Sequence, residues 1–510
     1  MPGQMEFVQM EFVQNFPCFS IMLCMFAGII SSAFKEKIAR LLNIIVLVVN
    51  IVLSAAVLLY TVRTGESYVY VMGRFPAPWG NELRVGMLET GLALFFCAIM
   101  LFCLLGGRHK LVQEVEEGKQ GLYYVLADLM LSSLLALIYT NDLFTAYVFV
   151  EINTISACGL IMIRQNGRTI EAAVRYMIMS LLGSGLFLVG ICMLYDLTGH
   201  LLMSNIKMEI AHIVAEGSYR PPLLVTIAII SVGLAIKSAL FPFHSWLPDA
   251  YGYSTVSSAA ILSSLVSKGY IFLLFKIIYR VIGFEVFHDS KIVDVLFIFG
   301  LLGMVFGSLS AIKENDIRRM IAFSSVAQVG YIYMGIGMGT QAGMIASVFH
   351  VISHVATKSL LFIAAIGLTD VSGGSRKFIE LTGSGYRNKW AGVAFSVGSL
   401  SMVGVPMFSG FISKLLFSQA AVNLYSITYT SLSFDRVSSL SYDNIFVNWI
   451  SHGRKSFLIF RHNIVFPHVH VMMQVITHPF RLPARRFQLF QSKSEQIFII
   501  RLKLNLSVFF

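Results

Sequence analysis

The chain has 510 residues, of which 56% are hydrophobic and only 13% are charged, and its formal net charge is +11. Because soluble domains carry about 25% charged residues, this composition excludes a soluble globular protein and indicates a membrane protein. Most of the excess positive charge lies in residues 425–510. The basic balance therefore does not indicate that the apolar part of the chain binds nucleic acid, and we expect no nucleic-acid partner.

Residues 1–16 precede the first apolar segment and are predicted to form an N-terminal extension. They carry Glu6 and Glu11 instead of a basic region, and no small-residue cleavage site follows, so we expect no ordinary signal peptide. The sequence MEFVQ occurs at 5–9 and again at 10–14, which makes Met10 a candidate alternative start.

Apolar segments follow one another from residue 17 to residue 420. A membrane-spanning helix needs about 20 such residues. The polar stretch 198–221 between two of them is long enough for a short amphipathic helix. The predicted fold class is an all-α polytopic membrane protein with about 12 transmembrane helices, at 17–34, 40–62, 87–106, 121–140, 142–163, 172–197, 222–243, 254–280, 292–312, 318–338, 343–368 and 389–420.

The loops predict an orientation, because lysine and arginine are enriched in cytoplasmic loops. Loops after odd-numbered segments contain more of these residues than loops after even-numbered segments. We therefore expect the odd-numbered loops in the cytoplasm and the N-terminus outside.

The predicted spans contain cysteines but no recognisable cofactor motif. All six cysteines lie in apolar stretches without a CxxC motif, which predicts buried apolar side chains rather than a disulfide framework or a metal site. Walker A, flavin, haem and iron–sulfur patterns are absent from the sequence. We expect no cofactor and no redox centre in this chain. The cysteines are Cys18, Cys24, Cys97, Cys103, Cys158 and Cys192.

Glu151 lies near the middle of the fifth segment, and Arg175 lies a turn inside the sixth. An ionised group at bilayer depth costs about 3 kcal/mol or more, so it normally faces a partner or a hydrated path. We expect Glu151 and Arg175 to form a buried pair across adjacent helices. The alternative is a purely structural clamp between these helices.

Lys237, in the seventh segment, precedes Pro242 by five residues, and Pro248 follows. Proline interrupts a helix, and broken helices in a bilayer face protein or a hydrated cavity. Buried lysines also exchange protons more readily than exposed ones. The seventh helix is therefore predicted to be discontinuous, with Lys237 on an ion path.

The eighth segment carries Lys268 at its middle, close to Ser263, Ser264 and Ser267. Lys268 is too deep to extend its ammonium group to the membrane surface, and we predict that it also lies on the path. Lys276, nearer the helix end, is expected to extend to the surface in this way.

The eleventh segment spaces His350, His354 and Lys358 at i, i+4 and i+8, which aligns them along one helical stripe. Two histidines at this spacing also suit a metal. Because neither a carboxylate nor a third ligand lies beside them, a proton relay is the favoured interpretation and we expect no metal.

The twelfth segment contains Pro406 and Gly410, with Lys414 eight residues after the proline. A second discontinuous helix with a lysine is predicted here. Because the seventh and twelfth segments share this combination, an internal structural repeat is a further hypothesis.

After residue 425 the composition changes to Ser, His and Arg, with apolar runs too short to span a membrane. Two interpretations of 426–510 are open. The segment is either a basic tail lying on anionic lipid or sequence out of register with the gene that encodes the first 425 residues. The second is favoured.

Several stretches resemble the antiporter-like subunits of respiratory complex I, most closely the D-type subunit of Mrp sodium/proton antiporters and the matching subunits of membrane-bound hydrogenases. The resemblance runs from about residue 17 to residue 425. It rests on FPAPWGNEL (75–83), NDLFTAYVFVEI (141–152), HSWLPDAY (244–251), ENDIRRMIAFSSVAQVGY (314–331), HVISHVATKSLLF (350–362) and GVPMFSGFISK (404–414).

This resemblance implies two inverted five-helix repeats, helices 4–8 and 9–13, each forming half of a proton path. It matches Glu151, Lys237, Lys268 and Lys414 to the family's ionisable residues of helices 5, 7, 8 and 12. The residues from His350 to Lys358 match the helix-11 relay. Arg175 stands where many members have lysine, and it would bias the charge of Glu151 rather than carry protons.

The resemblance also implies a departure. The family continues with helix 13, whereas this chain loses the pattern soon after Lys414, so the second repeat would be truncated and Lys414 exposed to lipid. We expect three regions: the extension 1–16, the antiporter-like domain 17–425 and the tail 426–510. As written, the chain is expected to fold poorly or to be inactive.

The predicted function is proton, or sodium/proton, translocation within a multi-subunit oxidoreductase or antiporter complex of a prokaryotic cell membrane. The partners implied are other membrane subunits, lipid, protons and sodium. Two alternatives remain: a stand-alone solute transporter and a non-conducting scaffold subunit.

Overall fold

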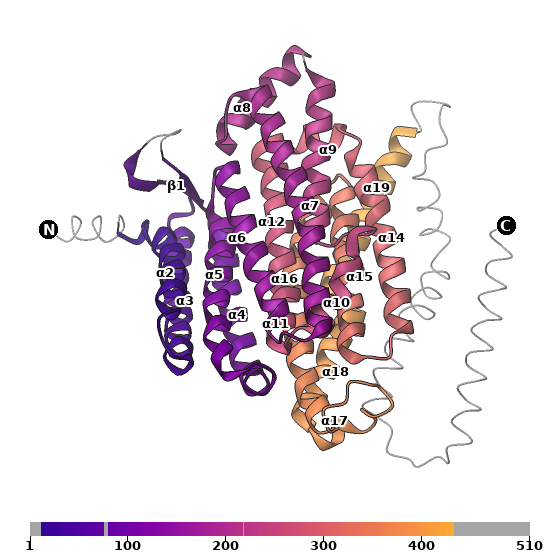
Figure 1. The fold of residues 1–510 in the computed structure, drawn as a ribbon. Helices are drawn as coiled ribbons and strands as arrows, with labels where there is room; N and C mark the ends of the chain where they lie inside the picture. Colours follow the sequence, from indigo (N-terminus) through magenta and orange to yellow (C-terminus); the bar gives the residue numbers. More distant parts are fainter. Residues whose placement is uncertain (1–11, 76–79, 218, 433–510) are drawn as a thin grey trace.

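The computed structural model describes residues 12–75, 80–217 and 219–432. In these ranges the chain is mainly helical, and the long helices run side by side in one bundle (Figure 1). Ten of the described helices are long and apolar enough to cross a membrane, and each corresponds to a predicted segment. The prediction of a mainly helical, multi-span membrane protein is confirmed. Most of the N-terminal extension and nearly all of the predicted tail lie outside the described residues.

The N-terminal part of the bundle consists of four helices and a hairpin. The hairpin strands are antiparallel, with Tyr68 opposite Val85 and Val71 opposite Glu82. The elements are α2 (Phe16–Ser31), α3 (Glu36–Thr64), β1 (Tyr68–Val71), η1 (Met72–Arg74), β2 (Glu82–Val85), α4 (Met87–Glu114) and α5 (Glu117–Tyr139).

The middle part contains the first broken helix and two π-helical turns, η3 and η4. The amphipathic helix predicted in 198–221 is present as α8, which buries Met203, Ile206, Ile210 and Ile213. The elements are α6 (Leu143–Met162), α7 (Gly167–Thr198), α8 (Met203–Glu216), α9 (Arg220–Lys237), η2 (Phe243–Trp246), α10 (Leu247–Tyr253), α11 (Val256–Ile261), η3 (Leu262–Val266), α12 (Ser267–Ile277), η4 (Ile278–Ile282) and α13 (Phe284–Asp289).

The C-terminal part divides the predicted segment 389–420 into two helices, and α2 has only 16 residues. Neither of these regions is among the ten spans, so the count of twelve stays a prediction. The elements are α14 (Ile292–Lys313), α15 (Ile317–Gly337), α16 (Gln341–Asp370), α17 (Ser384–Arg387), α18 (Lys389–Val403) and α19 (Ser409–Leu432).

Polar residues before the apolar runs determine where several helices begin. Asp142, Asn166 and Asp316 each accept a backbone N–H of the following first turn, at α6, α7 and α15. A side-chain acceptor at this position satisfies an amide that has no partner within the helix. These caps fix the ends of the helices that carry the candidate site.

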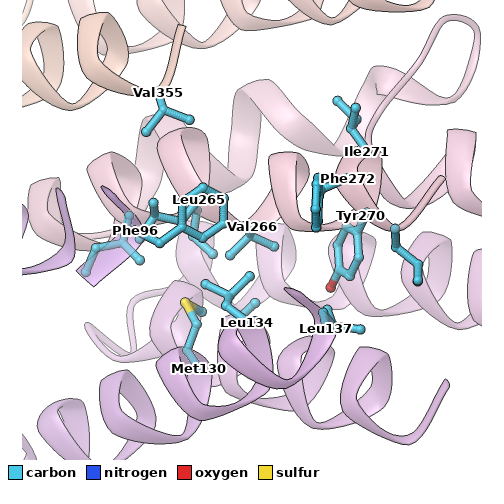
Figure 2. Close-up of a cluster of buried hydrophobic side chains, with 14 of the residues drawn as sticks. Phe96, Met130, Leu134, Leu137, Leu265, Val266, Tyr270, Ile271, Phe272 and Val355 are labelled. Atoms are coloured by element: carbon cyan, nitrogen blue, oxygen red, sulfur yellow. The ribbon is translucent and has the colours of Figure 1, made fainter. Parts of the chain in front are cut away.

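The helices form an inner group and an outer group. The segment 256–282, which includes α12, is buried over its whole apolar window, and α15 is nearly so, whereas α3 and α14 are mostly exposed. Figure 2 shows the apolar packing around α12: Tyr270 lies near Leu137 and Val266 lies near Leu134, both leucines coming from α5, while Val355 comes from α16. Lys268 therefore lies on the most enclosed helix of the bundle. The cysteines follow the same division in part: Cys24, Cys97 and Cys103 are buried as predicted, but Cys192 is exposed.

Helices α7 and α9 approach closely at a pair of glycines. A Cβ atom on Gly183 would lie 2.9 Å from the backbone oxygen of Gly233 and 3.1 Å from Cγ of Lys237. A Cβ on Gly233 would lie 2.7 Å from the backbone oxygen of Gly183. This close packing brings Lys237 against α7.

We predict that Gly183→Ala destabilises the protein, because the added methyl group must separate α7 from α9. Overpacking of this kind costs about 1–3 kcal/mol. The apparent unfolding temperature of the purified protein in detergent measures the effect. Gly185→Ala is the matched control on the same helix, since nothing lies within 4 Å of its Cβ position. Equal melting temperatures for the two variants would contradict the packing argument.

Candidate functional site

Lys237 is the last residue of α9, and only 2% of it is exposed. Its Nζ donates to Thr154 Oγ1 of α6 at 2.6 Å and to Ser180 Oγ of α7 at 3.0 Å. The ring of Tyr270, on α12, lies 5.6 Å from the same nitrogen. Four helices therefore converge on Lys237, and two hydroxyl groups accept its hydrogen bonds.

The helix ends at Lys237 because the following residues leave the α-helical conformation. Ala239 has a φ of 61°. Pro242 lies in the non-helical stretch before η2 and has no N–H to donate. Pro248 lies in the first turn of α10, where proline is well tolerated. Ser238 Oγ and Tyr333 OH are 2.6 Å apart, which ties this break to α15.

Glu151 lies on α6 about one turn before Thr154, and it is near enough to Lys237 for the two charges to interact. Its Oε1 is buried and has no hydrogen-bond partner among the described residues. Glu151 is therefore a carboxylate whose charge acts on Lys237.

The predicted pair between Glu151 and Arg175 is not formed, and this expectation was wrong. Arg175 is exposed and donates to Glu171 at 2.6 Å and to Asp249 at 2.9 Å. The reason is the antiparallel register of α6 and α7, in which Thr154 meets Ser180 and Cys158 meets Ala173. Arg175 thus lies some five to eight residues away from the level of Glu151, or about 10 Å along the helix axis.

Sequence reasoning missed a hydrogen-bonded chain that runs from Tyr270 to α5. Tyr270 OH donates to Asn153 Oδ1 at 2.9 Å, and Asn153 Nδ2 donates to Ser133 Oγ at 2.8 Å. All three side chains are buried. Asn153 and Thr154 occupy the turn after Glu151, so polar residues flanking the buried acid would have been the sequence signal.

Lys268 is the second residue after the π-helical turn η3, and 1% of it is exposed. Its Nζ donates to the backbone oxygen of Ser263 inside that turn. A π turn widens the helix and is often found at functional sites. Lys268 therefore finds its acceptor within its own helix, in a local distortion that periodicity alone does not predict.

His350, His354 and Lys358 are buried on α16. Lys358 Nζ donates to the Ile321 backbone oxygen at 2.7 Å and to Ser324 Oγ at 2.6 Å, both on α15. The rings of His350 and His354 stack with centroids 6.0 Å apart. Their predicted alignment on one stripe is observed.

Lys268 is close enough to His354 and Lys358 for their charges to interact, which connects α12 with α16. Among the described residues, neither lysine and neither of the two histidines forms an ion pair with a carboxylate. No group of three or more His, Cys, Asp or Glu side chains in the described part of the chain could hold a metal ion. The cluster is thus a set of nitrogen bases.

Lys414 lies on α19, after the break that contains Pro406. Its Nζ donates at 2.7 Å to the backbone oxygens of Met402 and Val403, which end α18. The ring of Tyr331 lies 5.5 Å away. The preceding residue, Ser413, connects α19 to α16, because its Oγ lies 2.9 Å from His350 Nδ1. Lys414 is half-buried and its ammonium group donates hydrogen bonds to backbone oxygens, in contrast to the expected exposure to lipid.

The expectation that Lys276 extends its ammonium group to the membrane surface was also wrong. Only 3% of Lys276 is exposed, and its Nζ donates to the backbone oxygens of Leu137, Ile138 and Thr140. The last carbonyls of a helix have no partner within it and attract cations. Lys276 therefore caps the C-terminus of α5 from inside the bundle.

Residues 140–439 match the model of one protein family, described as NADH:quinone oxidoreductase/Mrp antiporter, transmembrane. The N-type subunit of the NADH-quinone oxidoreductase of Desulforudis audaxviator is 34% identical over 360 residues, covering 71% of this chain and 70% of that protein. The D-type subunit of the Na(+)/H(+) antiporter of Alkalihalophilus pseudofirmus is 26% identical over 403 residues, covering 78% and 79%.

Two solved structures share the fold. The Mrp complex from Dietzia sp. DQ12-45-1b contains a chain with a TM-score of 0.74 at 23% identity, covering 92% of this chain and 81% of that one. A chain of the membrane-bound sulfane sulfur reductase, an archaeal respiratory complex, has a TM-score of 0.72 at 23% identity, covering 91% and 98%. The helix arrangement is therefore that of subunits found in both assemblies.

We predict that Lys276→Met destabilises the protein by about 2–4 kcal/mol, because three buried carbonyls lose their donor. Thermal unfolding in detergent is the measurement. Lys207→Met is the matched control, since Lys207 also donates to a backbone carbonyl, that of Tyr279, but is exposed. If the Lys276 variant is as stable as the Lys207 variant, the hydrogen bonds of Lys276 to the end of α5 do not contribute to the stability of the folded protein.

Proposed function

Because the chain belongs to the NADH:quinone oxidoreductase/Mrp antiporter transmembrane family, we propose that it moves protons across the membrane as one subunit of a multi-subunit complex. The observation that carries the proposal is a row of buried and half-buried ionisable side chains that runs through α6, α9, α12, α16 and α19. Its members are Glu151, Lys237, Lys268, Lys358, His354, His350 and Lys414.

The chemistry of the row favours protons over metal cations. Apart from Glu151, its members are amines and imidazoles, which bind protons, whereas hard cations such as calcium and magnesium prefer oxygen ligands. Sodium exchange enters only by similarity to relatives such as the antiporter of Alkalihalophilus pseudofirmus, whose name includes sodium. We therefore assign the proton to this row and leave sodium to other parts of the complex.

The first step of the proposed path is at Glu151 and Lys237. The hydroxyls of Thr154 and Ser180 accept the lysine's hydrogen bonds and equally could receive hydrogen bonds from water. A change in the charge of Glu151 alters the stability of the charge on Lys237, because opposite charges in a low-dielectric interior interact strongly. This pair is the coupling element of the N-terminal half.

The second step passes along α12. Tyr270 contacts Lys237 and lies two residues after Lys268, so one rigid helix carries both contacts. Lys268 in turn interacts with His354 and Lys358 across the interface with α16. Because like charges repel in the absence of a nearby acid, a proton arriving at Lys268 disfavours one on Lys358. Such repulsion would push the proton onward.

The last step leads from His354 through His350 and Ser413 to Lys414. The histidine rings are stacked, and Ser413 Oγ is hydrogen-bonded to His350 and lies beside Lys414 in sequence. The two nitrogens of an imidazole ring can accept and donate a proton, which suits a relay between two lysines. Arg175 has no place in this path, because its guanidinium is engaged outside the bundle core.

We further infer the arrangement that the resemblance implies. Residues 17–425 are the transport unit, the fourth to eighth and the ninth to thirteenth membrane-spanning helices of the family form inverted repeats, and the N-terminus is external. The basic residues at the Arg164 and Arg376 end of the bundle support that orientation, because positive loops favour the cytoplasm. Labelling of single cysteines introduced at residues 65 and 166, with a membrane-impermeant reagent in intact cells, tests it.

We predict that Glu151→Gln and Lys237→Ala each reduce proton transport by about 100-fold or more, the usual range for losing a proton-transferring group. Arg175→Gln should retain transport, because Arg175 does not contact Glu151. Proton uptake into inverted vesicles, followed with a pH-sensitive dye, measures all three, with membrane-inserted protein quantified in parallel.

Two results would contradict this scheme. Transport at the wild-type rate by the Glu151 and Lys237 variants would leave a scaffold subunit as the better interpretation. Solute uptake by the purified subunit alone, unaffected by either substitution, would favour a stand-alone solute carrier.

We also predict that Lys358→Arg blocks transport while Lys276→Arg preserves it. Arginine keeps the positive charge and the hydrogen-bond donors but does not release its proton. The substitution should therefore be harmful where lysine carries a proton and harmless where lysine caps a helix. The same vesicle assay compares the two variants, and equal activity of both would remove Lys358 from the path.

A further inference from the structure

A surface cavity of about 410 Å³ lies where the loop between α6 and α7 meets the end of α10 and the loop after α16. Three guanidinium groups line it, those of Arg164, Arg168 and Arg376, together with Asn166 and Tyr253. No acidic side chain among the described residues lines the cavity. Its size is within the range of about 300–1,000 Å³ that is usual for small-molecule sites.

The positive charge of this cavity is only partly compensated by its surroundings. Glu114 approaches Arg164 at 3.9 Å but is closer to Arg318, at 3.2 Å, and Asp316 lies 3.3 Å from Nε of Arg376. Arg168 forms no ion pair in the described part of the chain. The cavity therefore retains net positive charge.

The guanidinium groups are held in place before any ligand arrives. Arg164 Nη1 donates to the Tyr253 backbone oxygen at 3.2 Å, and Arg376 Nη1 donates to that of Gly252 at 2.8 Å. Arg168 lies over the ring of Tyr253, 5.7 Å from its centroid. Because these contacts leave other N–H groups of each arginine available, the site is preorganised for an anion with several acceptor oxygens.

The backbone adds to this preference. The cavity includes Gly167, the first residue of the 32-residue helix α7. The positive end of the helix dipole and the first-turn amides favour an anion there. The capping box between Asn166 and Thr169 uses only some of these groups.

We propose that this cavity binds the phosphate headgroup of an acidic phospholipid. Guanidinium groups match phosphate oxygens in geometry and charge. The lipid, rather than free phosphate, is assigned as the source because α6 and α7 are both membrane spans that end at this cavity, at Met162 and Gly167, so the site lies at headgroup depth. Basic pockets between membrane helices on the cytoplasmic side recognise such lipids.

The test uses the full-length protein in detergent, titrated with phosphatidylglycerol and, in parallel, with phosphatidylcholine and with inorganic phosphate. Bound lipid is counted by native mass spectrometry. We expect selective binding of phosphatidylglycerol, weakened about 5-fold by Arg168→Gln and roughly 30-fold by the double variant with Arg376→Gln, because each basic group near an anionic surface contributes a similar increment.

Arg108→Gln is the matched control, because Arg108 is exposed near the same end of the bundle, on α4, but does not line the cavity. Arg168→Gln keeps the test decisive if the double variant misfolds, since Arg168 has no ion pair to lose among the described residues. Binding of inorganic phosphate as tight as that of the lipid would overturn the lipid assignment. Wild-type lipid affinity in the folded Arg168 variant, or an equal loss in the Arg108 variant, would overturn the site.

Discussion

The structure depends on how an apolar bundle accommodates buried ammonium groups with few carboxylates beside them. An unpaired buried polar group is costly, so each buried lysine needs acceptors. Here backbone carbonyls at helix irregularities supply most of them. Lys268 uses the π turn η3, Lys276 uses the C-terminus of α5, and Lys414 uses the C-terminus of α18. The helix irregularities and the lysines therefore depend on each other. Each π turn or helix end leaves carbonyl oxygens without a partner inside the helix, and a lysine donates hydrogen bonds to them.

This arrangement gives the two halves of the bundle different electrostatics. Lys237 is held by hydroxyls and lies near Glu151, so its charge responds to a neighbouring acid. Lys268 donates to a carbonyl oxygen, and Lys358 donates to a carbonyl oxygen and to the hydroxyl of Ser324. Each of these lysines lies near another base, so each responds to the charge of the other. In the path that we propose, attraction in one half and repulsion in the other would give a mobile proton a direction. The hydrogen bond between Ser238 and Tyr333 couples the break in α9 to the second half.

The amino-acid sequence predicts the helices and the ionisable positions well, because both follow from apolar length and from charges that stand out within it. Partners are predicted less well. Glu151 and Arg175 are on adjacent helices, yet the register of α6 and α7, set by contacts such as Thr154 with Ser180, separates them. Lys276 was expected at the surface because it lies near a helix end, but the end of α5 lies beside it inside the bundle. Both errors concern how far neighbouring helices are shifted along their axes, which the hydrophobic periodicity of each helix does not encode.

Lys414 illustrates what this alignment contributes. The resemblance to the family led to the expectation that its ammonium group would be open to lipid without a further helix. In the structure, the chain reverses between α18 and α19, so that Lys414 reaches back to Met402 and Val403 across the break. A Cβ on Gly404, whose φ is 84°, would lie 2.7 Å from Cδ of Lys414, so the lysine passes directly over the backbone of the break. The acceptors come from the preceding helix and not from the following one. Within the described residues, the broken helix itself therefore supplies the acceptors of this last ionisable group.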